Sequence, residues 1–146
     1  MAYQTTIPIL VWILGSAPLV KEDLRSLTVP AWMVFGALGV FGVTSVMIGR
    51  EFAPAAVLSA GVLTVGALGL LMAPDSVGEA DVIYLAALAW LSSFWHLLLA
   101  VGVASLLAGT VYMVLPRLRQ ASSVGTPVPF LPFLFLGGLA ALLGAP

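Results

Sequence analysis

The sequence Gly78-Glu79-Ala80-Asp81 is followed by a stretch of 34 uncharged, mostly apolar residues, 82–115. As a single helix this stretch would be about 51 Å long, whereas the hydrocarbon core of a bilayer is roughly 30 Å thick. The stretch must therefore be broken, and the polar pair Ser92-Ser93 is the expected position of the break. This break predicts a short helical segment after Asp81 and a full-length segment over about residues 94–115.

The composition of the whole chain also indicates a membrane protein. Of its 146 residues, 62% are hydrophobic and only 8% are charged, whereas soluble domains carry about 25% charged residues. Continuous apolar runs long enough to span a bilayer recur along the chain, and such runs indicate helices. These runs lie at about residues 3–20, 29–48, 52–72, 94–115 and 128–143. We therefore expect an all-α polytopic membrane protein with about six transmembrane segments, forming a single domain over residues 1–146.

Several classes of site are excluded by residue counts. The chain has no cysteine and one histidine, His96, which excludes disulfides, thiolate metal sites, iron–sulfur clusters, a cysteine nucleophile and any multi-histidine metal site. We accordingly expect neither a metal nor a cofactor. The formal net charge of −1 leaves no basic patch for nucleic acid, and the expected partner is the lipid bilayer. No basic residue precedes the first apolar run, because the first positive charge is Lys21, so this run is expected to be a mature helix.

The few charged residues predict how the chain is oriented in the membrane. With six segments, the loops that carry Lys21, Arg25, Arg117 and Arg119 lie on one side of the membrane, and Arg50 lies on the other. The side richer in basic residues is normally cytoplasmic. This arrangement predicts a multi-pass protein of the cytoplasmic (inner) membrane, with the candidate site facing the cytoplasm.

Two acids stand out as candidate catalytic residues, namely Asp23 after the first apolar run and Asp81 before the fourth. Ionisable residues at the mouth of a membrane segment are costly to keep and indicate function. Two carboxylates in a low-dielectric site share a proton, so that one acts as a base on water and the other polarises a carbonyl group. Gly78 and Ala80 would let a backbone approach the acid closely.

The remaining polar residues have simpler interpretations. Asp75 and Glu79 are expected to be solvated residues of a loop, and Glu51 is expected to pair with its neighbour Arg50 at a turn. Tyr84 follows Asp81 by three positions and so shares its helix face. Packing is the expected role of this tyrosine, with donation of a hydrogen bond to the two acids as the alternative.

Three stretches in the same order resemble the type IV prepilin peptidase family, which includes the archaeal preflagellin peptidases and consists of membrane aspartic proteases of the GxGD type. The first is Asp23-Leu24-Arg25-Ser26-Leu27-Thr28-Val29-Pro30-Ala31-Trp32, similar to an aspartate, polar residues and Ile/Val-Pro-Asn before an apolar helix. The second is Gly78-Glu79-Ala80-Asp81-Val82 with Leu85-Ala86-Ala87-Leu88. The third is Val128-Pro129-Phe130-Leu131-Pro132-Phe133, similar to a Pro-Phe-x-Pro-Phe motif before the final helix.

The resemblance implies specific roles. Asp23 and Asp81 match the two catalytic aspartates of the family, Gly78 matches the first glycine of its motif, and Glu79 and Ala80 fall within that motif as supporting positions. Ala80 stands where the bacterial pattern has the second glycine, although archaeal relatives often have alanine there. Ile83 replaces a frequent lysine, and Ala31 replaces the asparagine after proline.

The implied activity is that of a minimal leader peptidase without methyltransferase activity. Such an enzyme would remove a short basic leader from prepilin-like, pseudopilin or archaellin precursors at the cytoplasmic membrane face. Two alternatives remain open. One is a small ion-coupled carrier that uses the same acids as proton or cation sites, and the other is a non-catalytic membrane scaffold.

Overall fold

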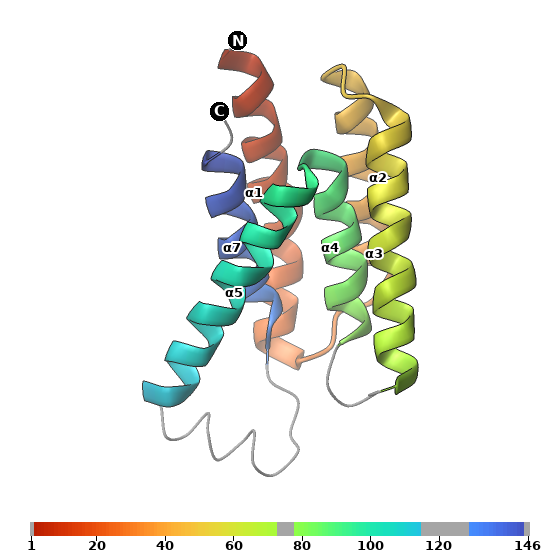
Figure 1. Cartoon of the computed structure of the whole chain (residues 1–146). Coiled ribbons are helices and arrows are strands. Elements are labelled where there is room, and N and C mark those ends of the chain that lie inside the picture. The colour runs from red at the N-terminus through yellow and green to blue at the C-terminus, as the bar shows by residue number, and fades with distance from the viewer. Residues whose placement is uncertain (1, 73–77, 115–128, 145–146) are drawn as a thin grey trace.

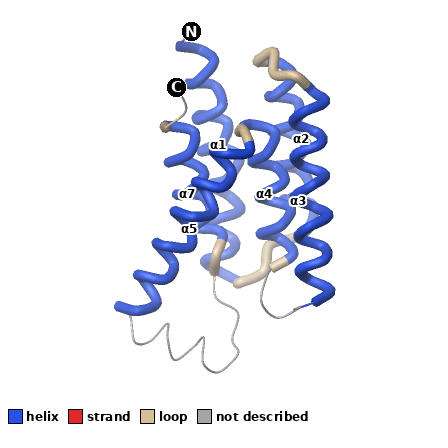
Figure 2. Tube along the Cα trace, viewed as in Figure 1, coloured by secondary structure: helices blue, strands red, loops and turns tan. Residues whose placement is uncertain are grey.

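The computed structural model describes residues 2–72, 78–114 and 129–144 (Figure 1), and within them every regular element is a helix (Figure 2). The all-α prediction is thus confirmed for the described part of the chain. The helices are α1 (Ala2–Ser26), α2 (Ala31–Met47), α3 (Phe52–Met72), α4 (Glu79–Leu91), α5 (Phe94–Val114) and α7 (Leu131–Leu143).

Successive helices run in alternating directions, so their connections lie at two opposite ends of a bundle. At the lower end of Figure 1, α1, α3 and α5 end, and α2, α4 and α7 begin. The upper end carries the α2–α3 turn and the α4–α5 junction. These are the lower end and the upper end of the bundle.

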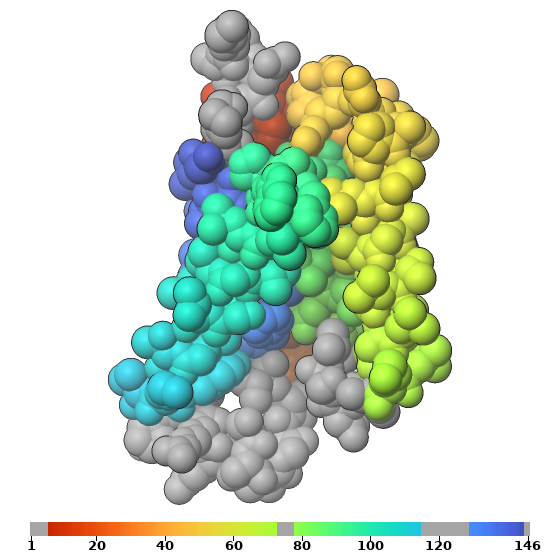
Figure 3. Space-filling view, in the orientation of Figure 1, coloured from red at the N-terminus to blue at the C-terminus, as the bar shows by residue number. Residues whose placement is uncertain are grey.

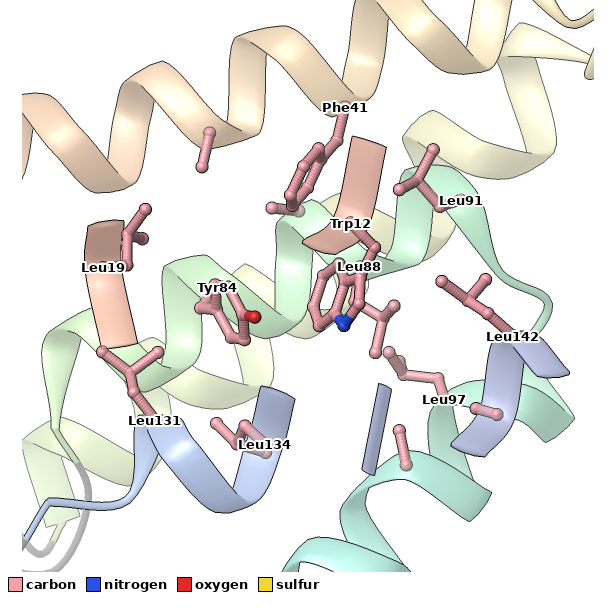
Figure 4. Packing of buried hydrophobic residues seen from close by; sticks show 14 of the residues in the cluster. Trp12, Leu19, Phe41, Tyr84, Leu88, Leu91, Leu97, Leu131, Leu134 and Leu142 are labelled. Carbon is pink, nitrogen blue, oxygen red and sulfur yellow. The ribbon is translucent and has the colours of Figure 1, made fainter. Parts of the chain in front are cut away.

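The short helix α4 lies at the centre of the bundle. It packs against α2, α3, α5 and α7, and most of its side chains are buried. Its Tyr84 ring lies 4.7 Å from the ring of Trp12 on α1, whose centroid is 5.3 Å from that of Phe41 on α2. Figure 4 shows these rings packed among leucines of α4 and α7. In the space-filling view, the green α4 is visible only as a narrow strip between the teal α5 and the yellow α3, and part of the blue α7 is visible on the other side of α5 (Figure 3).

Glycines at the helix crossings permit this close packing. A Cβ atom at Gly137 of α7 would collide with the backbone carbonyl of Ala100 on α5, and one at Gly138 would collide with the indole of Trp12. On α3, a Cβ at Gly66 would overlap the side chain of Val82 on α4. Small residues at such positions let helices approach closely.

The break predicted at Ser92-Ser93 is confirmed, because α4 ends at Leu91 and α5 begins at Phe94. The Ser92 hydroxyl donates a hydrogen bond of 2.9 Å to the carbonyl of Leu88 and so satisfies one of the free carbonyl groups at the end of α4. With 13 residues, α4 is about 20 Å long. It is therefore shorter than α2, α3 and α5, and the α4–α5 junction does not reach the level of the α2–α3 turn (Figure 1).

The end of α1 differs from the prediction. The polar residues 21–26 were expected to form a loop, but α1 continues to Ser26. Lysine, glutamate and arginine are good helix formers, so polarity alone does not end a helix here. Leu27 ends it with φ of 56°, a left-handed conformation that is uncommon outside glycine. Asp23 is consequently fixed on a helix.

The outer faces of the bundle are strongly apolar. Large hydrophobic side chains are exposed on α1, α2, α3 and α5, including Leu14, Val43, Val57, Leu71 and Leu106. By length and composition, α3 and α5 are long and apolar enough to cross a membrane, and α2 and α7 are shorter apolar helices. Exposed apolar surface of this extent marks a surface that contacts lipid or another protein.

Candidate active site

The position of Asp23 follows from the periodicity of α1. Trp12, Ser16, Leu19 and Asp23 are all buried, and their spacing of three or four residues places them on one face of the helix. The neighbouring charged side chains of Lys21 and Arg25 are exposed. Asp23 is only 7% exposed, so it is the one charged side chain of this helix end that points fully into the bundle.

Asp81 lies in the first turn of α4, also at the lower end of the bundle. Gly78 precedes this helix in an extended conformation and acts as its N-cap residue. A Cβ atom at Gly78 would lie 2.8 Å from the Oδ2 atom of Asp81, so the carboxylate folds back over this glycine. The backbone amide of Gly78 donates to that carboxylate. The glycine therefore permits an approach that other residues would obstruct.

The two carboxylates lie at the same end of the bundle, on the separate helices α1 and α4. Asp23 follows the apolar part of α1, and Asp81 precedes the apolar part of α4. Burial raises the pKa of Asp81 to about 7, and the negative charge of Asp23 contributes to this shift. Burial also raises the pKa of Asp23, while the Leu131 backbone amide opposes that shift. Two acids that are 58 positions apart in the sequence thus interact electrostatically within one site.

Two further groups at this site were not identified from the sequence. The first is the backbone N–H of Leu131 at the start of α7, which donates to Asp23. The second is Tyr112 near the end of α5, which lies close enough to Asp23 and Asp81 to interact with both charges. Its hydroxyl donates a long hydrogen bond of 3.4 Å to the carbonyl of Pro129. In the sequence, the only signals were the proline-rich start of the last helix and the position of Tyr112 just before a polar loop.

One oxygen of the site has no partner. Oδ2 of Asp23 is buried and makes no hydrogen bond among the described residues. Buried polar atoms are normally hydrogen-bonded, so an exception calls for a functional explanation. An acceptor of this kind, next to a second acid with a pKa near neutrality, is suited to hold a proton or an attacking water.

The other predicted residues lie as follows. Glu79 is exposed in the first turn of α4, and Ala80 is half-buried against the hydrophobic cluster. Tyr84 is fully buried. Its hydroxyl lies near that of Ser16 and meets no hydrogen-bond geometry with any residue that the structure describes, so its role there is packing and not donation to the acids. Asp75 lies outside the described residues.

Metal ligands do not gather at this site within the part of the chain that the structure describes, where no three His, Asp or Glu side chains lie together. The arrangement is that of two acids, two backbone donors and a tyrosine hydroxyl. No protein-family model, no curated protein and no solved structure matches the chain. The chemistry open to the two acids accordingly follows from their own surroundings.

Proposed function

We propose that the chain is an integral-membrane aspartic endopeptidase in which Asp23 and Asp81 activate water. The observation that carries this proposal is the interaction of a buried acid, Asp23, with a half-buried acid, Asp81, contributed by separate helices at one end of an apolar bundle. Two acids in a shared low-dielectric site share a proton, so that one serves as a base while the other serves as an acid. The sequence resemblance to the prepilin peptidases supports the same assignment.

The surroundings of the acids suggest how the roles are divided. Asp81 has a pKa of about 7, raised by burial and by the charge of Asp23, so it is the proton-bearing member of the pair near neutrality. Asp23, which the Leu131 amide helps to keep ionised, takes a proton from water. The water oxygen attacks the carbonyl carbon of the scissile peptide while Asp81 donates its proton to the carbonyl oxygen. On collapse of the tetrahedral intermediate, the C–N bond breaks, the proton held by Asp23 passes to the leaving nitrogen, and Asp81 recovers its proton from a hydroxyl group of the intermediate.

The proposed substrates are prepilin-like, pseudopilin or archaellin precursors, each with a short basic leader before an apolar helix. Glu79 is exposed beside Asp81, and Glu22 lies next to Asp23. Carboxylates at the rim of the site would attract a basic leader. Cleavage would then fall directly before the apolar helix of the substrate, at the lower end of the bundle.

The proposal includes six membrane-spanning segments in the cytoplasmic membrane, with the lower end facing the cytoplasm. The exposed apolar side chains support membrane insertion, and so do the two long apolar helices, α3 and α5. Lys21 and Arg25 lie at the lower end and Arg50 at the upper end, which agrees with the usual excess of basic residues on the cytoplasmic side.

Cleavage of precursor proteins with and without the two acids tests this proposal. Purified full-length protein in liposomes would be given a panel of precursors with basic leaders. Asp23→Asn and Asp81→Asn should each lower the cleavage rate at least about 100-fold, since each removes one member of an acid–base pair.

The matched control is Lys21→Gln, which changes an exposed side chain two positions before Asp23 and should cleave like the wild type. Circular dichroism of each variant verifies that the fold is retained. If both asparagine variants cleaved precursors at the wild-type rate, the two acids would not be the catalytic residues. Proton-coupled uptake into the same liposomes, abolished by either variant in the absence of cleavage, would instead favour the carrier.

A further inference from the structure

A cavity of about 570 Å³ lies at the upper end of the bundle, away from the two aspartates. It is bounded by the α2–α3 turn, the first turns of α3 and the α4–α5 junction, and it is partly open to the outside. Its lining includes Arg50, Glu51, Val57, Leu58, Ser93 and Phe94. Because α4 is short, its junction with α5 lies below the α2–α3 turn (Figure 1), and the teal start of α5 adjoins the yellow α3 beneath that turn (Figure 3). The cavity is thus a consequence of the helix lengths.

Among the described residues that line this cavity, Arg50 alone carries a positive charge. The expected ion pair between Arg50 and Glu51 is not formed, and the guanidinium has no other partner among the described residues. Its main chain is held in place, since its backbone N–H donates a hydrogen bond of 3.1 Å to the carbonyl of Ser45. The side chain is half-buried, whereas that of Glu51 is exposed. A partly buried guanidinium without a counter-charge is an incomplete site, because five donors and a full charge remain unsatisfied.

Apart from Glu51, Ser92 and Ser93, the remaining lining of the cavity is apolar. Val57, Leu58 and Phe94 lie beside the arginine, and Val57 and Phe94 belong to the exposed apolar surface of the bundle. A ligand that matches this lining has an anionic group for the guanidinium and a hydrocarbon chain for the apolar walls. Guanidinium groups bind phosphate oxygens through paired hydrogen bonds.

From this charge complementarity we infer that the cavity binds an anionic glycerophospholipid, with its phosphodiester on Arg50 and one acyl chain along Val57, Leu58 and Phe94. The inference rests on the membrane insertion proposed above, but it is independent of proteolysis. The lipid would fill the space that the short helix α4 leaves at the upper end and so connect α3 with α5.

Lipid titration of the purified full-length protein in detergent tests the inference. Dioctanoyl phosphatidylglycerol is the probe, and binding is read from native mass spectrometry and from the rise in the melting temperature. The wild type should bind this lipid more tightly than dioctanoyl phosphatidylcholine. Arg50→Gln should bind phosphatidylglycerol about tenfold more weakly, as expected for loss of a charge-assisted hydrogen bond.

Two variants distinguish lipid binding in this cavity from nonspecific lipid binding elsewhere on the protein. Arg25→Gln removes the same charge from an exposed position at the lower end and should bind like the wild type. Val57→Trp leaves Arg50 in place but fills the cavity from an exposed wall position, so it should weaken binding by steric exclusion. It also provides the test if Arg50→Gln does not fold.

Three results would overturn the inference. They are equal binding of both lipids by the wild type, unchanged phosphatidylglycerol binding in Arg50→Gln or in Val57→Trp, and a melting-temperature rise that inorganic phosphate reproduces in full. The last result would identify an anion site that does not recognise lipid. Because no peptide is used, lipid binding by a protein that fails to cleave precursors would refute the proposed protease while leaving this inference intact.

Discussion

The carboxyl group of Asp81 links the chemistry of the site to the stability of the fold. Its pKa is raised from the ordinary value of 3.8 to about 7 in the folded protein. Between these two pH values the folded protein retains a proton that the unfolded chain releases. The stability contributed by this proton is therefore complete below about pH 4 and is lost as the pH rises through about 7. Near pH 8 the ionised Asp81 lowers the stability of the fold.

Replacing Asp81 with its neutral isostere should consequently stabilise the protein at alkaline pH. We expect Asp81→Asn to raise the free energy of unfolding at pH 8 by up to roughly 4 kcal/mol, at 1.36 kcal/mol per pKa unit, and to have little effect at pH 4. Thermal unfolding in detergent at both pH values measures the difference. Glu79→Gln, at an exposed neighbouring position, should show no such pH dependence. Equal destabilisation of Asp81→Asn at both pH values would contradict the raised pKa.

The candidate residues Asp23 and Asp81 could be chosen from the sequence because charged residues are rare in this chain and both acids adjoin apolar runs. The donors around them could not be chosen in the same way. The Leu131 amide is a backbone group, so no residue type reveals it, and its position depends on where α7 begins. Tyr112 approaches the acids only because α5 packs against α7, where its ring is 5.9 Å from that of Phe133.

At the level of helices, the apolar runs predicted all six described elements and the break between α4 and α5. The break could be predicted because a single helix of 34 residues would be about 51 Å long, more than the roughly 30 Å of a bilayer's hydrocarbon core. The prediction was wrong at the end of α1, where helix propensity and the left-handed Leu27 set the boundary. The choice of packing partners was not predictable either, because it depends on which glycines meet a neighbouring backbone.

The crossing of α5 and α7 supplies a direct test of that packing. Gly137→Ala would place a methyl group against the Ala100 carbonyl of α5, and the rigid backbone there cannot move aside as a flexible side chain would. We expect a loss of about 1–3 kcal/mol in the free energy of unfolding, as is typical of overpacked cores. Thermal unfolding in detergent measures this loss.

Gly102→Ala on α5 is the matched control, because a Cβ atom there meets nothing within 4 Å. Alanine is the better helix former by about 1 kcal/mol, so this variant should be as stable as the wild type or more stable. If Gly137→Ala were equally harmless, the helices would not cross as closely as described.

Over the whole molecule, charge and apolar surface are arranged along the bundle axis. The two acids, Lys21 and Arg25 lie at the lower end, Arg50 lies at the upper end, and exposed hydrophobic side chains cover the length between them. An isolated soluble bundle would have the opposite distribution, with charged residues along its sides. The arrangement predicts that each end is accessible from a different side of a membrane.

Labelling of single cysteines tests this orientation, and the absence of native cysteine means that each variant carries one thiol. Thr28→Cys at the lower end should react with a membrane-impermeant maleimide only from the cytoplasmic side, and Glu51→Cys at the upper end only from the opposite side. Leu106→Cys, on the exposed side of α5, should react from neither side in membranes, because acyl chains cover it, and should react once the protein is denatured. Labelling of Thr28→Cys and Glu51→Cys from the same side would contradict the proposed topology. Rapid labelling of Leu106→Cys in intact membranes would show that this face contacts water, and the membrane insertion on which both proposals depend would fail with it.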